Sequence, residues 1–211
     1  MGSEASALSL VAILRGICPD QVVAVGNILY DAGIRAIEIP LNSPDPFASI
    51  GALAACNRSD WIIGAGTVLD VEQVRRTHEA GGRLVVAPNC DADVIRAALQ
   101  LSLHVMPGFA TATEAFAALR AGAKQLKLFP AATYGPRHLQ ALRAVLPRDA
   151  EVFPVGGIGA ADIAPWLAAG AAGFGFGSEL FRPHYSLADI KQRATDLVRT
   201  MQASRRQLGP P

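Results

Sequence analysis

The repeating unit of this chain is clearest in residues 120–130, which read Arg120-Ala121-Gly122-Ala123-Lys124-Gln125-Leu126-Lys127-Leu128-Phe129-Pro130. The glycine after Arg120-Ala121 suits the left-handed conformation that closes many helices. An apolar run then extends from Gln125 to Phe129, which has the length and composition of a buried strand. The stretch therefore predicts a helix that ends near Gly122 and a strand that follows it closely.

The same helix-to-strand junction recurs along the chain. Glycine closes three more predicted helices, at Asp31-Ala32-Gly33, Glu79-Ala80-Gly81 and Ala168-Ala169-Gly170, and a strand candidate follows each. The predicted strands are Leu10 to Arg15, Ala36 to Leu41, Trp61 to Thr67, Arg83 to Pro88, His104 to Pro107, Gln125 to Phe129, Glu151 to Val155 and Gly173 to Gly177. Predicted helices open at Pro19-Asp20, Asp45-Pro46, Asp70, Asp91, Thr111 and Pro136, because proline, acidic and hydroxyl residues suit helix N-termini.

Eight strand-then-helix units predict an α/β fold, a (β/α)8 TIM barrel that forms a single domain over residues 1–211. The competing architecture is an open doubly wound sheet, which usually carries a glycine-rich turn after its first strand. Here the first strand ends in Leu14-Arg15-Gly16-Ile17 without such a turn. We expect a short polar N-terminus and an exposed, mobile tail from about residue 203.

Composition narrows the function classes. The chain is 51% hydrophobic and 18% charged, with a net charge of +1, so it shows no basic footprint for nucleic acid. Cysteines at 18, 56 and 90 form neither a CxxC pair nor a disulfide framework, which fits a reducing cytoplasm. No apolar stretch is long enough for a membrane span, so we expect no membrane partner.

Lys127 is a charge inside an apolar strand candidate. Loss of hydration lowers the pKa of an ammonium, which makes the amine available as a nucleophile that forms a Schiff base. A lone lysine in such a run more often lays its stem along apolar surface and keeps its ammonium in water. The choice between these interpretations depends on the residues around Lys127.

Two other charges lie in the predicted barrel strands, Arg15 in the first and Glu38 in the second. Side chains alternate along a strand, so Ile37 and Ile39 facing the helices place Glu38 inward. Leu126 and Leu128 place Lys127 inward in the same way. We expect Glu38 and Lys127 to meet near the end of the barrel that carries active sites, although a buried ion pair without a catalytic role would show the same pattern.

Glycines follow the seventh and eighth strands, where barrels commonly bind phosphate through backbone N–H groups. The segments are Val155-Gly156-Gly157 and Gly177-Ser178. Metal chemistry has little support, because the four histidines, at 78, 104, 138 and 184, are scattered. We expect no metal and no cofactor.

At these residues the chain resembles the class I aldolases that cleave 2-keto-3-deoxy-6-phospho sugar acids. The matching segments are Ile13 to Ile17, Glu38 to Pro44, Gly64 to Val68, Pro88-Asn89, Pro107-Gly108, Ala110 to Glu114, Lys127 to Pro130 and Val155 to Gly157. They follow the order of the predicted strands and cover most of the chain.

The resemblance implies a role for each candidate site residue. Lys127 would form the Schiff base, and Glu38 would be the general acid/base. Arg15 and Thr67 would hold the substrate carboxylate, Pro88 and Phe129 would shape the pocket, and Gly156, Gly157, Gly177 and Ser178 would hold the phosphate. The family resemblance also implies a homotrimer.

The family has branches that differ in the C4 configuration of their substrate. The gluconate branch typically has arginine where this chain has Asn42 and threonine where it has Val155. Both departures resemble the branch that cleaves 2-dehydro-3-deoxy-6-phosphogalactonate to pyruvate and glyceraldehyde 3-phosphate. The alternatives are activity on the gluconate epimer or on both epimers, a phosphosugar isomerase or epimerase, and a noncatalytic phosphate-ligand binding protein.

Overall fold

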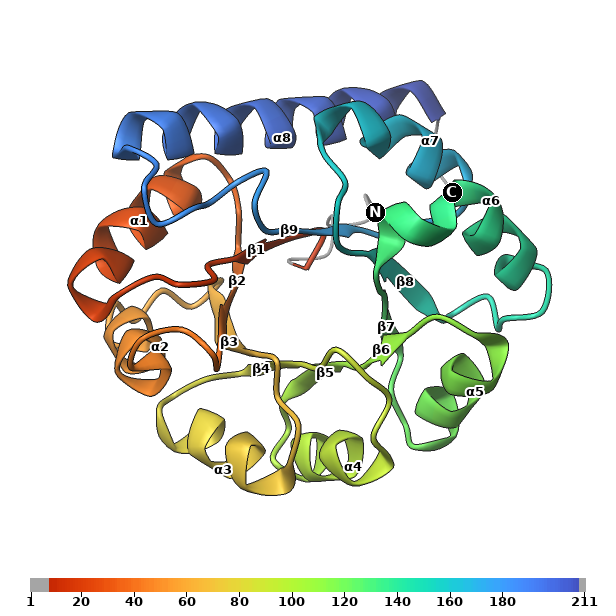
Figure 1. Ribbon diagram of the computed structural model, residues 1–211, viewed down its shortest axis with the longest axis horizontal. Coiled ribbons are helices and arrows are strands. Elements are labelled where there is room, and N and C mark those ends of the chain that lie inside the picture. The colour runs from red at the N-terminus through yellow and green to blue at the C-terminus, as the bar shows by residue number, and fades with distance from the viewer. Residues whose placement is uncertain (1–7, 209–211) are drawn as a thin grey trace.

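The structure is a computed structural model that describes residues 8–208. The polar N-terminus predicted from the sequence and the last three residues lie outside this range. Strands and helices alternate along the described chain, as Figure 1 shows. No helix within residues 8–208 is long and apolar enough to cross a membrane.

The observed strands fall within the eight predicted ones, except that the two-residue strand β6 was not predicted. They are β1 (Leu10–Ile13), β2 (Ala36–Pro40), β3 (Ile62–Gly66), β4 (Leu84–Val86), β5 (His104–Met106), β6 (Gly108–Phe109), β7 (Gln125–Leu128), β8 (Glu151–Pro154) and β9 (Phe174–Phe176). The helices are α1 (Pro19–Asp31), α2 (Pro46–Ala54), α3 (Val71–Glu79), α4 (Ala92–Gln100), α5 (Ala112–Arg120), α6 (Ala131–Arg143), α7 (Ile163–Ala168) and α8 (Leu187–Leu208), with a 3-10 helix at Ala160–Asp162.

All strand pairs in the described chain are parallel, and they form two curled sheets. One sheet has the order β5-β4-β3-β2-β1-β9, and the other has the order β6-β7-β8. An isolated parallel bridge between Val155 and Gly175 brings the second sheet against the first beside β9. The helices lie outside the strands in Figure 1. The prediction of an α/β fold with a parallel sheet and external helices is therefore confirmed.

Local signals in the sequence set most of the helix ends. Thr111 and Glu114 form a reciprocal capping box at the start of α5, and Asp70 and Asp91 accept hydrogen bonds from backbone N–H groups of α3 and α4. The four closing glycines at positions 33, 81, 122 and 170 all have positive φ, as a left-handed C-terminal cap requires. The predicted start at Pro136 follows a break inside α6, because Gly135 is non-helical.

The strands separate two apolar layers. Ile37 and Ile39 of β2 and Leu126 and Leu128 of β7 pack with the helices in the larger core. A second group, here called the inner cluster, occupies the inside of the sheets and consists of Leu8, Val11, Ala36, Ile62, Leu84, Val86, Met106 and Phe153. Glu38 follows Ala36 on the inward side of β2, so the predicted inward orientation of Glu38 agrees with the packing.

The sequence predicted an exposed, mobile tail from about residue 203, but this segment is helical and its residues 203–205 are buried or half-buried. Helix α8 continues to Leu208, and Ser204 is only 6% exposed. The half-buried Arg205 donates a hydrogen bond from Nη2 to the carbonyl oxygen of Ala172 at 2.7 Å. Packing along one face of the helix holds this segment, although its sequence is polar.

This packing predicts that enlarging Ser204 destabilises the protein. Ser204→Phe introduces an aromatic ring into a filled site, so we expect a loss of about 1–3 kcal/mol in the free energy of unfolding. The exposed Gln207→Phe is the matched control and should change stability by less than about 0.5 kcal/mol. Chemical denaturation of both variants measures the difference, and equal stability of the two would show that α8 does not pack at its end.

Candidate active site

The charged residues singled out from the sequence lie on or just after three strands: Arg15 follows β1, Glu38 is the central residue of β2, and Lys127 is the last but one residue of β7. Glu38 on β2 pairs in register with Ile13 of β1 and Gly64 of β3. Lys127 on β7 pairs with Gly108 and Phe153. Both side chains line one small cavity, together with Val11, Ile13, Val86, Met106, Val155 and Gly175. Residues from both sheets therefore meet at a single site.

Glu38 and Lys127 are almost completely removed from water, with 1% and 5% of their surface exposed. Burial raises the pKa of the Glu38 carboxyl, and the positive charges of Lys127 and Arg15 only partly oppose this shift. Burial also lowers the pKa of the Lys127 ammonium, which Glu38 opposes and Arg15 reinforces. Both shifts favour the neutral forms, which an amine nucleophile and a proton donor require.

The two buried charges do not form an ion pair. Both residues lie in the described part of the chain, yet no Glu38 oxygen lies within 4.0 Å of Lys127 Nζ. Glu38 Oε2 is buried without a hydrogen-bond partner among the described residues. Because buried polar atoms are nearly always paired in proteins, an unpaired carboxylate oxygen in a cavity makes Glu38 a candidate functional group.

Gly66, at the end of β3, leaves the space that the Glu38 carboxylate fills. A Cβ atom at position 66 would lie 1.4 Å from Glu38 Oε2 and 2.2 Å from Cδ. The backbone of Gly66 has no positive φ, so this contact, and not backbone conformation, requires glycine. No role for Gly66 could be predicted from the sequence, because its contact with Glu38 joins two different strands.

Two loops above β1 and β2 are joined by side-chain hydrogen bonds. Arg15 donates from Nη1 to Asn42 Oδ1 at 2.5 Å, and the backbone N–H of Gly16 donates to Ser43 Oγ at 2.9 Å. Arg15 is exposed and Ser43 is buried. Asn42 therefore fixes the position of the Arg15 guanidinium, a contact that sequence analysis did not identify.

Thr67 follows β3 directly and has a φ of +58°. A β-branched residue in the left-handed region is strained by about 1–3 kcal/mol, and such strain concentrates at functional sites. Thr67 is half-buried, at the same end of the strands as Arg15. The residue therefore lies at the carboxyl end of β3, as the strand prediction placed it.

The apolar residues that were expected to shape the pocket also follow the ends of strands. Pro88 is half-buried after β4, and Phe129 follows β7 with its ring centroid 5.1 Å from Lys127 Nζ. Phe129 is 37% exposed, which is unusual for its size. Val155 lines the cavity that contains Lys127.

The candidate phosphate segments lie side by side. The Val155–Gly175 bridge aligns the ends of β8 and β9, so Gly156 and Gly157 emerge next to Gly177 and Ser178. Gly156 and Gly157 have φ values of +98° and +71°. In the described chain the N–H groups of Gly157 and Ser178 donate no hydrogen bond to another residue, which leaves them available for an anion.

The chain is similar to known proteins both in sequence and in structure. The chain matches the family model described as "Aldolase: KDPG and KHG aldolase" over residues 3–196. It is 48% identical to the 2-dehydro-3-deoxy-6-phosphogalactonate aldolase of Escherichia coli strain K12, over 91% of this chain and 94% of the relative. It is 34% identical to the 2-dehydro-3-deoxy-phosphogluconate aldolase of Pseudomonas aeruginosa, over 78% of this chain and 73% of the relative. A solved structure titled "Native KDPGal structure" superposes with a TM-score of 0.92 and 45% identity, covering 97% of this chain and 98% of the other.

Because a Cβ atom at position 66 would overlap the Glu38 carboxylate, one added methyl group there should impair catalysis. Gly66→Ala displaces the carboxylate, so we expect kcat to fall by at least about tenfold while KM changes less, because overpacking disturbs one group of the site. Steady-state kinetics measure both values. Gly51→Ala is the control, since a Cβ there meets nothing closer than 3.7 Å.

A second variant separates misplacement from misfolding. Glu38→Asp retracts the carboxylate by one carbon, so Gly66→Ala should cost less in that background than in the wild type. Equal losses in the two backgrounds would contradict the contact as the cause.

Proposed function

Because the chain belongs to the KDPG and KHG aldolase family of carbon–carbon lyases, we propose that it cleaves 2-dehydro-3-deoxy-6-phosphogalactonate to pyruvate and glyceraldehyde 3-phosphate. The observation that carries the proposal is the burial of Lys127 and Glu38 in one cavity without an ion pair between them. The relative named for the galactonate phosphate is more similar to this chain than the one named for the gluconate phosphate.

Lys127 is the nucleophile in this proposal. Its neutral amine adds to the C2 ketone, and loss of water gives an imine that is protonated. Glu38 donates its proton to the departing hydroxyl during this dehydration, and the carboxylate so formed accepts the proton of the C4 hydroxyl. The C3–C4 bond then breaks, and its electron pair moves into the imine to give an enamine. Glyceraldehyde 3-phosphate leaves, the enamine takes a proton at C3, and hydrolysis of the imine releases pyruvate. No cofactor is needed, because the protonated imine accepts the electrons.

The remaining site residues bind the two anionic ends of the substrate. Arg15 and Thr67 hold the carboxylate, and Asn42 keeps the Arg15 guanidinium in place through its hydrogen bond. Pro88 and Phe129 shape the pocket between the two ends. The phosphate lies on Gly156, Gly157, Gly177 and Ser178, where the free N–H groups and left-handed glycines support an anion site.

We further propose that the two sheets are parts of one closed (β/α)8 barrel. The parallel bridge beside β9 and the direct succession of β5 and β6 around Pro107 support closure, since β5 and β6 then form one interrupted barrel strand. A homotrimer follows from the family resemblance. Three free cysteines fit the reducing cytoplasm as the compartment.

Val155 favours the galactonate epimer by keeping the cavity wall apolar. It is 6% exposed and lies with Glu38 and Lys127 around the cavity. Threonine at this position would add a hydroxyl that donates or accepts a hydrogen bond inside the pocket. The choice between epimers then depends on polar contacts near the reacting carbons.

The Schiff-base step predicts selective labelling of one lysine. The chain has three lysines, and Lys124 and Lys191 are exposed whereas Lys127 is buried. Its lowered pKa gives Lys127 a larger neutral fraction near pH 7 than an ordinary lysine, so pyruvate with cyanoborohydride should modify Lys127 alone. Peptide mass spectrometry locates the adduct. Lys191→Arg should leave the labelling unchanged, and an unmodified Lys127 would end the aldolase mechanism proposed for this chain.

The substrate assignment predicts a higher kcat/KM on the 6-phosphogalactonate substrate than on its gluconate epimer. Val155→Thr should lower the ratio of the two values by roughly tenfold, the effect of one pocket contact. The exposed Val145→Thr is the matched control and should leave the ratio unchanged. Equal values on both epimers in the unmodified protein would instead identify a dual-epimer aldolase.

A further inference from the structure

A polar groove lies at the amino ends of β3 and β4, opposite the end that carries Glu38 and Lys127. It has a volume of about 570 Å³, including its open mouth. The end of α2, the loop before β3 and the residues before β4 form its walls. Its lining residues include Asn57, Arg58, Ser59, Trp61 and Arg83.

Arg58 is held in the groove without a carboxylate partner among the described residues. Its Nη2 donates to Asn27 Oδ1 at 2.8 Å. The guanidinium lies 3.8 Å from the ring centroid of Tyr30 and 5.3 Å from that of Trp61. Neutral partners and aromatic rings therefore fix the position of Arg58 while its charge stays uncompensated.

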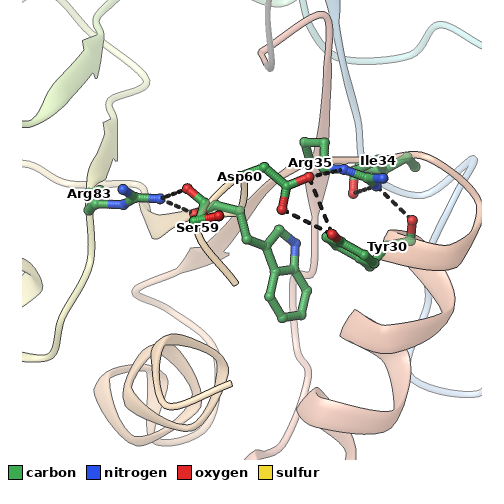
Figure 2. Close-up of polar contacts among 7 residues, drawn as sticks. Tyr30, Ile34, Arg35, Ser59, Asp60 and Arg83 are labelled. Carbon is green, nitrogen blue, oxygen red and sulfur yellow. Dashed lines mark hydrogen bonds and ion pairs between the residues drawn. The ribbon is translucent and has the colours of Figure 1, made fainter. Parts of the chain in front are cut away.

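Arg83 approaches the groove from the start of β4. Its Nη2 donates to the carbonyl oxygens of Trp61 and Ser59, the second at 3.4 Å. Figure 2 shows the Arg83 side chain reaching the loop at Ser59. No carboxylate within residues 8–208 pairs with Arg83, so its remaining N–H groups and its charge are also free for a ligand.

The carboxylate of Asp60, in the loop before β3, already has partners. Asp60 accepts hydrogen bonds from Arg35 Nε at 2.8 Å and from the Tyr30 hydroxyl at 3.0 Å, on the Arg35 side of the loop in Figure 2. Its charge is balanced by Arg35. Two arginines consequently line one groove, and neither has a carboxylate partner among the described residues.

We propose that this groove binds a phosphate dianion, either inorganic phosphate or the phosphate group of a small monoester. Arg58 and Arg83 supply two positive charges and N–H donors that match phosphate oxygens. Asn57 and Ser59 add polar groups to the lining. Both arginines are already ordered by their neutral contacts, so binding costs little side-chain entropy. This site is separate from the phosphate site proposed for the substrate, because it lies at the other end of the strands.

Trp61 provides a local reporter, since it lines the groove and the chain has only one other tryptophan. The experiment uses the full chain with Trp166→Phe, so that emission comes from Trp61 alone. Inorganic phosphate and glycerol 1-phosphate are titrated separately, with sodium chloride at matched ionic strength as the reference. We expect a saturable change in emission with both phosphates and none with chloride.

Variants test which side chains hold the anion. Arg58→Gln and Arg83→Gln should each raise the apparent Kd for phosphate by at least about tenfold, because each removes charge-assisted hydrogen bonds. Arg75→Gln is the control, since Arg75 is exposed and pairs with Glu72, and it should leave the Kd unchanged. Retained aldolase turnover shows that each variant is folded.

The relative affinities for the two phosphates identify the ligand. Tighter binding of the monoester identifies an organic phosphate as the ligand, and equal or weaker binding identifies free phosphate. A Trp61 response that does not saturate, that chloride reproduces, or that survives in both Arg58→Gln and Arg83→Gln overturns the proposal.

Discussion

The structure depends on placing two opposite charges, Lys127 and Glu38, inside parallel strands without letting them touch. Burial favours the neutral form of each group, and each charge limits the pKa shift of the other. A direct ion pair would remove this balance, because close contact stabilises both charged forms. Separation therefore leaves burial as the largest influence on both groups, so the pKa of the Glu38 carboxyl stays raised and the pKa of the Lys127 ammonium stays lowered.

Several features of the fold maintain this separation. The inner cluster packs inside the sheets, and its members Val11, Val86 and Met106 line the cavity together with Glu38 and Lys127. Gly66 supplies the space for the Glu38 carboxylate, and the β2–β3 register brings the two strands together along their length. Arg15 acts on both charges from the rim, and Asn42 fixes its position. The chemistry of the site is thus set by packing in the strands and by hydrogen bonds in the loops.

Short-range rules predicted all the strands except β6, the starts of α1 to α5 and the inward direction of Glu38, because alternation and capping depend on neighbours in the sequence. Contacts between distant residues were not predictable in this way. The overlap of Gly66 with Glu38 and the Arg15–Asn42 bond each join different strands or loops. The end of α8 was mistaken for a tail for the same reason, since Arg205 bonds to Ala172, far away in the sequence. The expected role of the glycines after β8 and β9 in phosphate binding came from the family resemblance. Glycine turns alone do not indicate one function, because they occur in many kinds of loop.

The inner cluster also separates the two ends of the strands. Ile63 of β3 lines the polar groove, and Gly66 of the same strand contacts Glu38 at the other end. Between these two positions Gly64 pairs in register with Leu84, one of the buried apolar side chains of the inner cluster, and buried apolar layers are close-packed in proteins. A filled layer of this kind transmits little motion unless it has a second packing arrangement. A ligand in the groove therefore stabilises the folded chain by mass action, whereas the positions of Lys127 and Glu38 are set by their own side of the layer.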